Sequence, residues 1–109
     1  MLDFLERVFR VEYDVTRCAG AQEALAALER EPYDVLVTDQ KMPLMSGLEL
    51  LDRIGPLYPG MAKVMLSGFT DVPEVQRLVD THRLHNYAVK PIDSERLLEA
   101  VEEALARAR

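Results

Sequence analysis

The sequence predicts a doubly wound α/β domain, in which a parallel sheet lies between two layers of helices. Short continuous apolar runs at 35–37, 64–66 and 87–89 are typical of strands that helices cover on both faces. Segments with apolar residues at helical spacing separate these runs, and strands that alternate with helices pair in parallel through right-handed crossovers. With 109 residues the chain is long enough for one hydrophobic core, so we expect a single domain over residues 1–109.

The first third of the chain predicts a helix, a strand and a second helix. Apolar residues recur at helical spacing from Leu2 to Phe9, so the sequence starts within a helical segment. Apolar and polar residues alternate at 11–15, which is typical of a half-exposed strand at a sheet edge. Helical spacing returns at 21–28, and Pro32 ends this second helix because proline has no backbone N–H to donate.

Capping and turn residues mark the remaining elements. These are helices at 46–58, 72–79 and 94–108, and a loop at 82–86. Ser46 and Glu49 have capping-box spacing for the first of these helices. Pro73 lies in the first turn of the second, where its missing N–H costs no hydrogen bond. Asp93 or Ser94 caps the third.

Composition excludes several classes of protein. A net charge of -6 is the wrong sign for gripping phosphate backbones, so we expect no nucleic acid partner for this domain alone. No apolar run approaches the ~18 residues that span a bilayer, and no secretion signal is present, so we expect no membrane association and a cytoplasmic location. Cys18 is the single cysteine and cannot form an internal disulfide, which fits a reducing compartment.

Three chemically useful side chains follow the three buried strands. Asp39, Ser67 and Lys90 stand where each run ends. Each alone is ordinary, since Asp and Ser-Gly commonly form turns. However, the carboxyl ends of parallel strands share one edge of a sheet, so we expect the three to meet there. Together they suit phosphoryl transfer, because a carboxylate can form an acyl phosphate while an ammonium and a hydroxyl hold the phosphoryl oxygens.

Four segments stand in the order and spacing of a known family. They are Asp34-Val35-Leu36-Val37-Thr38-Asp39, Met42-Pro43-Leu44-Met45-Ser46-Gly47, Ser67-Gly68 and Tyr87-Ala88-Val89-Lys90-Pro91. In these the sequence resembles the receiver domain of two-component response regulators, over nearly the whole chain. The resemblance implies a flavodoxin-like three-layer fold and a cis Lys90–Pro91 bond.

The resemblance also implies a role for each site residue. Asp39 is expected to be the phosphoacceptor, Lys90 the contact to the phosphoryl group and Ser67 the switch hydroxyl. Tyr87 is the aromatic residue expected to turn inward when Ser67 moves. Asp39 and the backbone carbonyl of Lys41 are the expected Mg²⁺ ligands. The expected partner is a sensor histidine kinase or a phosphotransfer protein.

One part of the family pattern is absent from this sequence. Similar receivers start with another buried strand, which ends in an acidic pair that completes the magnesium site. Here residues 1–9 already predict the following helix, so we expect an N-terminally truncated receiver that lacks the first central strand. Asp3 and Glu6 have helical spacing and are not assigned as ligands, so we expect a weak Mg²⁺ site.

The missing strand leaves three alternatives open. The sequence begins after the natural start of the domain, or another molecule fills the gap, or the strand at 11–15 pairs directly with that at 35–37. Loss of a central strand removes buried apolar side chains from a core of modest size. We therefore expect a marginally stable or self-associating chain, as a homodimer or by strand swapping.

Three functions remain to be weighed. A phosphorylation-controlled switch at Asp39 ranks first, and a receiver-like binding module that is not phosphorylated ranks second. An enzyme of similar architecture ranks last, because no Gly-rich loop opens a helix and Asp39-Gln40-Lys41 lacks the second Asp of acid-base phosphatases. His82 and His85 have metal-ligand spacing, but such a pair in a polar loop is usually solvated.

Overall fold

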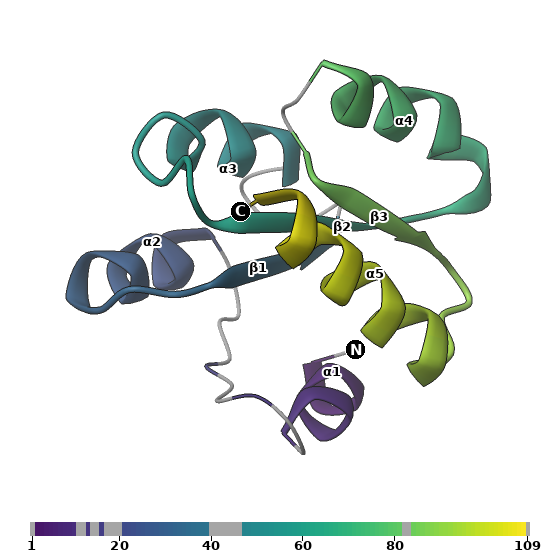
Figure 1. Ribbon diagram of the computed structural model, residues 1–109, viewed down its shortest axis with the longest axis horizontal. Helices are drawn as coiled ribbons and strands as arrows, with labels where there is room; N and C mark the ends of the chain where they lie inside the picture. Colours follow the sequence, from purple (N-terminus) through teal and green to yellow (C-terminus); the bar gives the residue numbers. More distant parts are fainter. Residues whose placement is uncertain are drawn as a thin grey trace.

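The computed structural model describes residues 2–10, 13, 16, 21–39, 47–81 and 84–108. The helices are α1 (Leu2–Phe9), α2 (Ala21–Arg30), α3 (Gly47–Ile54), α4 (Val72–Asp80) and α5 (Ser94–Ala108). The strands are β1 (Val35–Asp39), β2 (Ala62–Ser67) and β3 (Asn86–Val89), and a short 3₁₀ helix, η1 (Phe69–Asp71), precedes α4 (Figure 1). Helices and strands thus alternate from α2 onward, as the hydrophobic pattern predicted.

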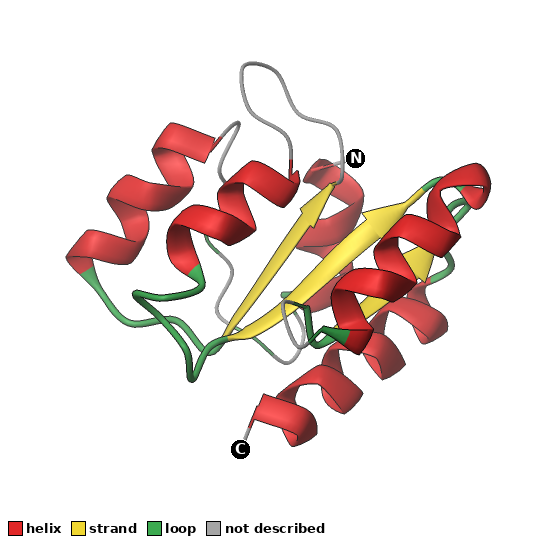
Figure 2. Cartoon of the chain, turned by 90° about the horizontal axis from the view of Figure 1, so that it is seen from above, coloured by secondary structure: helices red, strands yellow, loops and turns green. Residues whose placement is uncertain are grey.

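The strands form a parallel sheet in the order β1-β2-β3, with helices on both faces (Figures 1 and 2). On one face, Phe9 of α1 and Val101 of α5 pack in one cluster with Val64 of β2. On the other face, Leu51 of α3 and Val75 of α4 pack around Met65. This arrangement confirms the doubly wound, flavodoxin-like fold class predicted from the sequence.

The central strand carries the core and ends at a candidate site residue. All six residues of β2 are buried. Because strand side chains alternate between faces, Val64 and Leu66 point toward α5, and Met65 and Ser67 point toward α3 and α4. Ser67 is therefore held at the carboxyl edge by a strand that is buried along its whole length.

Strand β1 is less buried than its apolar run predicted. Val35, Leu36 and Val37 are half-buried rather than covered on both faces. The reason is that β1 pairs only with β2 among the described residues, so it lies at an edge of the three-stranded sheet. The strand predicted at 11–15 falls almost wholly outside the described residues. Tyr13 alone is described there, and its N–H donates to the carbonyl oxygen of Phe9 at 2.8 Å.

Helix α3 ends earlier than the sequence pattern indicated. It was predicted to reach Tyr58 but ends at Ile54. The next residues are Gly55 and Pro56, and a Cβ atom at Gly55 would lie 2.9 Å from the carbonyl oxygen of Leu51. Proline cannot donate the next helical hydrogen bond, so the chain turns here. The predicted cap, Ser46, lies outside the described residues.

The two C-terminal helices follow their predicted signals. Pro73 lies in the first turn of α4, as expected. Helix α5 begins at Ser94, and the Asp93 side chain caps it by accepting the N–H of Arg96 at 2.9 Å. Between them, Asn86 belongs to β3 rather than to the predicted loop, and the Lys90–Pro91 bond is cis, as expected.

Candidate functional site

Asp39 and Lys90 form an ion pair at the carboxyl edge of the sheet. The Nζ atom of Lys90 lies 2.5 Å from Oδ2 of Asp39. Their strands flank β2, so the two backbones are about 9 to 10 Å apart and the long lysine side chain bridges the gap. The Lys90 side chain is 36% exposed and that of Asp39 is 25% exposed. The carboxylate of Asp39 is therefore partly exposed to solvent.

Ser67 lies between these residues and is tied to one of them through the backbone. Its carbonyl oxygen accepts the N–H of Lys90 at 2.8 Å. Its hydroxyl donates to the carbonyl oxygen of Gly68 at 3.0 Å, and the residue is fully buried. The structure thus brings the three predicted residues to one edge of the sheet, with a direct side-chain contact between Asp39 and Lys90.

Tyr87 lies on the α4 side of the sheet with its hydroxyl turned to that helix. In the β2–β3 register it is the partner of Met65, and its half-buried ring packs against the cluster around Met65 and Val75. Its hydroxyl donates to Oε1 of Gln76 at 3.1 Å. Ser67 and Tyr87 therefore point to the same face of the sheet, which is the arrangement that a coupled movement requires.

The described side chains do not form a magnesium site. Within the described ranges there is no group of three or more His, Cys, Asp or Glu side chains that could hold a metal. Asp39 supplies one carboxylate, with one oxygen paired to Lys90, whereas Mg²⁺ demands near-octahedral oxygen coordination. Lys41, whose carbonyl was the other expected ligand, lies outside the described residues. Glu6 lies on α1, as its helical spacing predicted, and its Oε1 lies 3.7 Å from Nη2 of Arg10, the residue that follows the helix.

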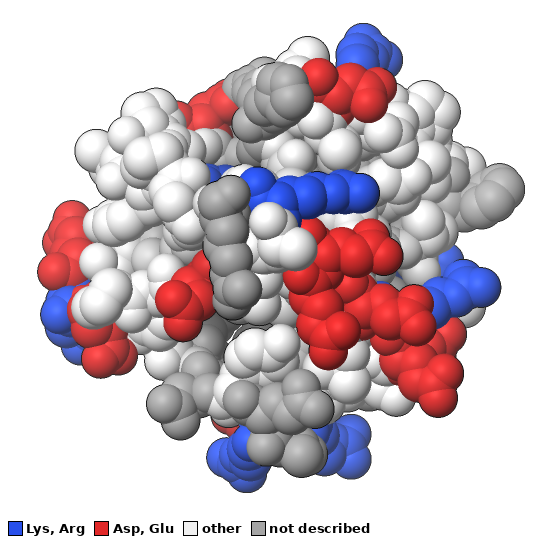
Figure 3. Space-filling model, in the orientation of Figure 1, with Lys and Arg blue, Asp and Glu red and all other residues white. Residues whose placement is uncertain are grey.

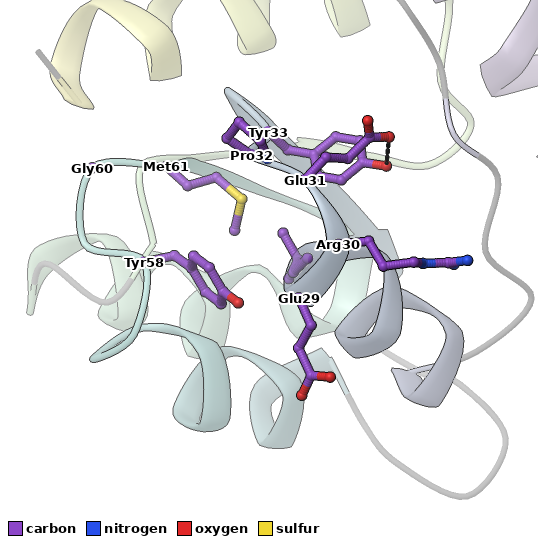
Figure 4. Close-up of a pocket in the computed structure, with 9 residues that line it drawn as sticks. Glu29, Arg30, Glu31, Pro32, Tyr33, Tyr58, Gly60 and Met61 are labelled. Atoms are coloured by element: carbon purple, nitrogen blue, oxygen red, sulfur yellow. Dashed lines mark hydrogen bonds between the residues drawn. The ribbon is translucent and has the colours of Figure 1, made fainter.

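A pocket of about 430 Å³ lies at the amino ends of the strands, opposite to the carboxyl ends where Asp39 stands. It is lined by residues that precede β1 and β2, among them Pro32, Tyr33 and Met61. Figure 4 shows Tyr33 and Tyr58 on two sides of this space, with the Tyr33 hydroxyl bonded to Glu31. Because these residues stand at the amino ends of the strands, the pocket is separate from the Asp39 edge.

Two ionisable residues on this amino-terminal side of the sheet make contacts that the sequence pattern did not predict. Lys63 is buried within β2, and its Nζ donates to the carbonyl oxygens of Tyr58 and Met61, both at 2.8 Å. Burial lowers the pKa of Lys63 from its ordinary 10.5. A lysine directly before the apolar run at 64–66 was the available sequence signal, and it marks a structural contact.

His85 is held by the backbone of the same strand. Its Nδ1 accepts the N–H of Lys63 at 3.0 Å, and its own N–H donates to the Lys63 carbonyl at 2.9 Å. Burial, and after it the positive charges of Lys63 and Arg107, lower the pKa of His85 below its ordinary 6.5. The expectation that this His-x-x-His pair is solvated is wrong for His85, which is half-buried and hydrogen-bonded. His82 lies outside the described residues.

Comparison with known families gives the identity of this fold. The sequence profile of the response regulator receiver domain matches residues 1–102. The chain belongs to the receiver-domain family. Receiver domains of two-component response regulators are signalling switches, and they generally bind Mg²⁺ at the phosphorylation site.

Particular relatives support the same assignment. This receiver domain is 31% identical over 103 residues to the hydrogenase transcriptional regulatory protein HoxA of Cupriavidus necator, covering 94% of this chain and 21% of that protein. Among solved structures, a CheY-like receiver domain protein from Methanospirillum hungatei superposes with a TM-score of 0.85 at 32% identity, covering 98% of this chain and 86% of that one. A structure described as an adenylate cyclase from Rhodopirellula baltica gives 0.91 at 25% identity, covering 98% and 80%.

The receiver domain spans about a fifth of the curated relative's length. In the part of the chain that the structure describes, no helix is both long and apolar enough to cross a membrane.

Proposed function

We propose that this receiver domain accepts a phosphoryl group on Asp39 from a histidine kinase or a phosphotransfer protein. The observation that carries the proposal is the contact between Nζ of Lys90 and Oδ2 of Asp39 at the carboxyl edge of the sheet. A partly exposed carboxylate beside a fixed ammonium is suited to receive a negatively charged group and to hold it by charge-assisted hydrogen bonds.

The transfer follows from the chemistry of the two partners. A carboxylate oxygen of Asp39 attacks the phosphorus of a phosphohistidine donor, forming an O–P bond as the P–N bond breaks. The electron pair of the broken bond stays on the donor imidazole. Lys90 then pairs with the phosphoryl oxygens, so its positive charge offsets the charge that Asp39 has gained.

The switch depends on the neighbours of the new phosphoryl group. Phosphorylation replaces the single negative charge of the Asp39 carboxylate by roughly -1.5 to -2 charges on the phosphoryl group, at a site that now holds one salt bridge. The buried hydroxyl of Ser67 is drawn toward the phosphoryl oxygens, and Tyr87 moves into the space that opens on the same face. Reversing a population from 1:99 to 99:1 requires about 5.5 kcal/mol, which two charge-assisted contacts with repacking can supply.

The surface that carries the signal consists of α4, β3 and α5, because β3, the strand that carries Tyr87, packs against both helices. Helix α5 contributes acidic residues to it, and Figure 3 shows red side chains gathered over this helix. The exposed ones are Glu95, Glu99, Glu102 and Glu103. This charge favours a partner with a basic face over a second copy of the same surface. The proposed homodimer or strand-swapped association is therefore assigned to the half-buried edge strand β1.

Magnesium is proposed as a weakly held ligand of Asp39 and of the Lys41 carbonyl. Among the described residues no group of three or more His, Cys, Asp or Glu side chains gathers around Asp39, which supports weak rather than tight binding. The same observation favours a second candidate function, a binding module that uses the α4-β3-α5 surface without phosphorylation.

A phosphoryl mimic separates the two candidates. We expect beryllofluoride with Mg²⁺ to shift the backbone amide resonances around Ser67 and Tyr87 in the natural sequence and to leave an Asp39→Asn variant unchanged. An Asp34→Asn variant is the matched control, since Asp34 is exposed and stands at the other end of β1. Resonances that do not respond in the natural sequence would favour the unphosphorylated module.

A further inference from the structure

We propose that Gln76 is a positioning residue that holds Tyr87 in its resting place and so sets how readily the receiver switches. This inference rests on the proposed function, because it assigns a regulator to the same site. Two hydrogen bonds carry it. The Tyr87 hydroxyl donates to Oε1 of Gln76 at 3.1 Å, and Nε2 of Gln76 donates to Oδ1 of Asp80 at 3.0 Å.

Asp80 explains why the Gln76 amide presents its oxygen to the tyrosine. Asp80 stands one helical turn after Gln76 on α4. An ionised carboxylate accepts hydrogen bonds and cannot donate them. It therefore takes the NH₂ group of Gln76 and leaves the amide oxygen as the acceptor for Tyr87. The side chains of Tyr87, Gln76 and Asp80 thus form an ordered chain of donors and acceptors that runs from β3 onto α4.

The sheet register places this contact within reach of the switch. Ser67 is paired with Val89 and Met65 with Tyr87, so Tyr87 and Ser67 are diagonal neighbours on one face. Strand spacing and rise put their Cα atoms about 8 Å apart, within reach of a tyrosine ring that changes rotamer. A ring that moves toward Ser67 has to leave Gln76, so the hydrogen bond opposes this movement.

The hydrogen bond between Tyr87 and Gln76, called the latch below, is weak enough for the domain to switch. Gln76 is exposed and Tyr87 is half-buried, so water competes for the bond. A hydrogen bond of this kind favours the resting position by about 2-fold to 10-fold. Phosphorylation can overcome a preference of this size. Loss of the hydrogen bond should make the domain easier to switch.

The first experiment observes Tyr87 without any ligand. In a protein with ¹³C-labelled tyrosine rings, we expect Gln76→Leu to move the Tyr87 ring resonances, because the acceptor is gone. Gln76→Glu keeps an acceptor of the same length and should leave the ring near its natural position. Arg77→Ala is the control, as an exposed neighbour on α4. Tyr87 resonances that are identical in Gln76→Leu and the natural sequence would overturn the proposal.

The second experiment measures the consequence for switching. We expect Gln76→Leu to bind beryllofluoride with Mg²⁺ about 2-fold to 10-fold more tightly than the natural sequence. Tyr87→Phe should give the same gain, and the double variant should gain no more, because both changes remove one bond. Additive gains or no gain in Gln76→Leu would contradict the latch.

The two experiments also keep the latch apart from the proposed function. If the natural sequence does not bind beryllofluoride, the phosphorylation proposal fails. The ring resonances of the ligand-free variants then decide on their own whether Gln76 positions Tyr87.

Discussion

The backbone N–H of Lys90 donates to the carbonyl oxygen of Ser67 at 2.8 Å. This bond continues the pairing of β2 with β3 past the end of β3, so the backbone under Lys90 is fixed by the sheet. The lysine side chain is then free to serve the carboxylate of Asp39 while its backbone stays in place. Substitutions of Lys90 or Asp39 should therefore alter the chemistry of the site more than the fold.

Replacing Lys90 by Met should lower the stability only a little. It should remove most of the response to a phosphoryl mimic. The ion pair with Asp39 is partly exposed, and such pairs contribute about 0.2 to 1 kcal/mol. We expect the free energy of unfolding, measured in urea, to fall by no more than this amount. The resonance shifts induced by beryllofluoride should be largely lost. Arg10→Met removes a similar pair on α1 and should keep the response. A Lys90→Met protein that responds like the natural one would contradict the assigned role of Lys90.

Replacing Ser67 by Ala should uncouple binding from movement. The variant loses the hydroxyl bond to Gly68, at a cost of about 0.5 to 1.5 kcal/mol in the free energy of unfolding. Asp39 and Lys90 remain, so the phosphoryl mimic should still bind, although the Tyr87 ring resonances should no longer respond. If Tyr87 moves as far as in the natural sequence, Ser67 is not the switch hydroxyl.

His85 should make stability fall in mild acid. The folded protein holds its Nδ1 as an acceptor for Lys63, and its pKa lies below 6.5. Below about pH 6.5 the unfolded chain therefore binds more protons at His85 than the folded one does. The stability from this residue is present above that pH and is lost as pH falls through the lowered pKa.

The measurement is urea unfolding at a series of pH values for the natural sequence and for His85→Gln. The carboxylates contribute to both proteins, so the difference between the two pH profiles isolates His85. We expect the natural sequence to lose more stability than the variant between pH 7 and 5. Parallel profiles would show that His85 does not titrate differently on folding.

Edge strand β1 bears on the association state. Its residues Val35, Leu36 and Val37 are half-buried in the described structure, and apolar edge strands tend to pair with other chains. We expect the unfolding midpoint to rise with protein concentration and sedimentation to show self-association. A stable monomer whose unfolding is independent of concentration would contradict this expectation.

The sequence predicted the layers well because their signals are local. The apolar runs of β1, β2 and β3 and the cap at Asp93 each act over a few residues. The early end of α3 was missed because the apolar spacing continues through Tyr58, whereas Gly55 and Pro56 decide the backbone. The exposure of β1 was missed because burial depends on neighbouring strands rather than on the composition of the strand itself.

The site divides in the same way. The topology rule for parallel strands was enough to bring Asp39, Ser67 and Lys90 to one edge. The partners of Tyr87 and His85 were not predictable, because Gln76 and Lys63 meet them only through the register of β3 against α4 and β2. The roles assigned to Asp39, Ser67, Lys90 and Tyr87 in phosphorylation stay predictions.

The central claim is that Asp39 takes a phosphoryl group, and mass spectrometry of the intact protein tests it most directly. The receiver domain is mixed with a phosphorylated histidine phosphotransfer protein and Mg²⁺, beside its Asp39→Asn and Asp34→Asn variants. We predict a mass gain of one phosphoryl group in the natural sequence and in Asp34→Asn, and none in Asp39→Asn. An unchanged mass in all three proteins, or an equal gain in Asp39→Asn, would contradict the account.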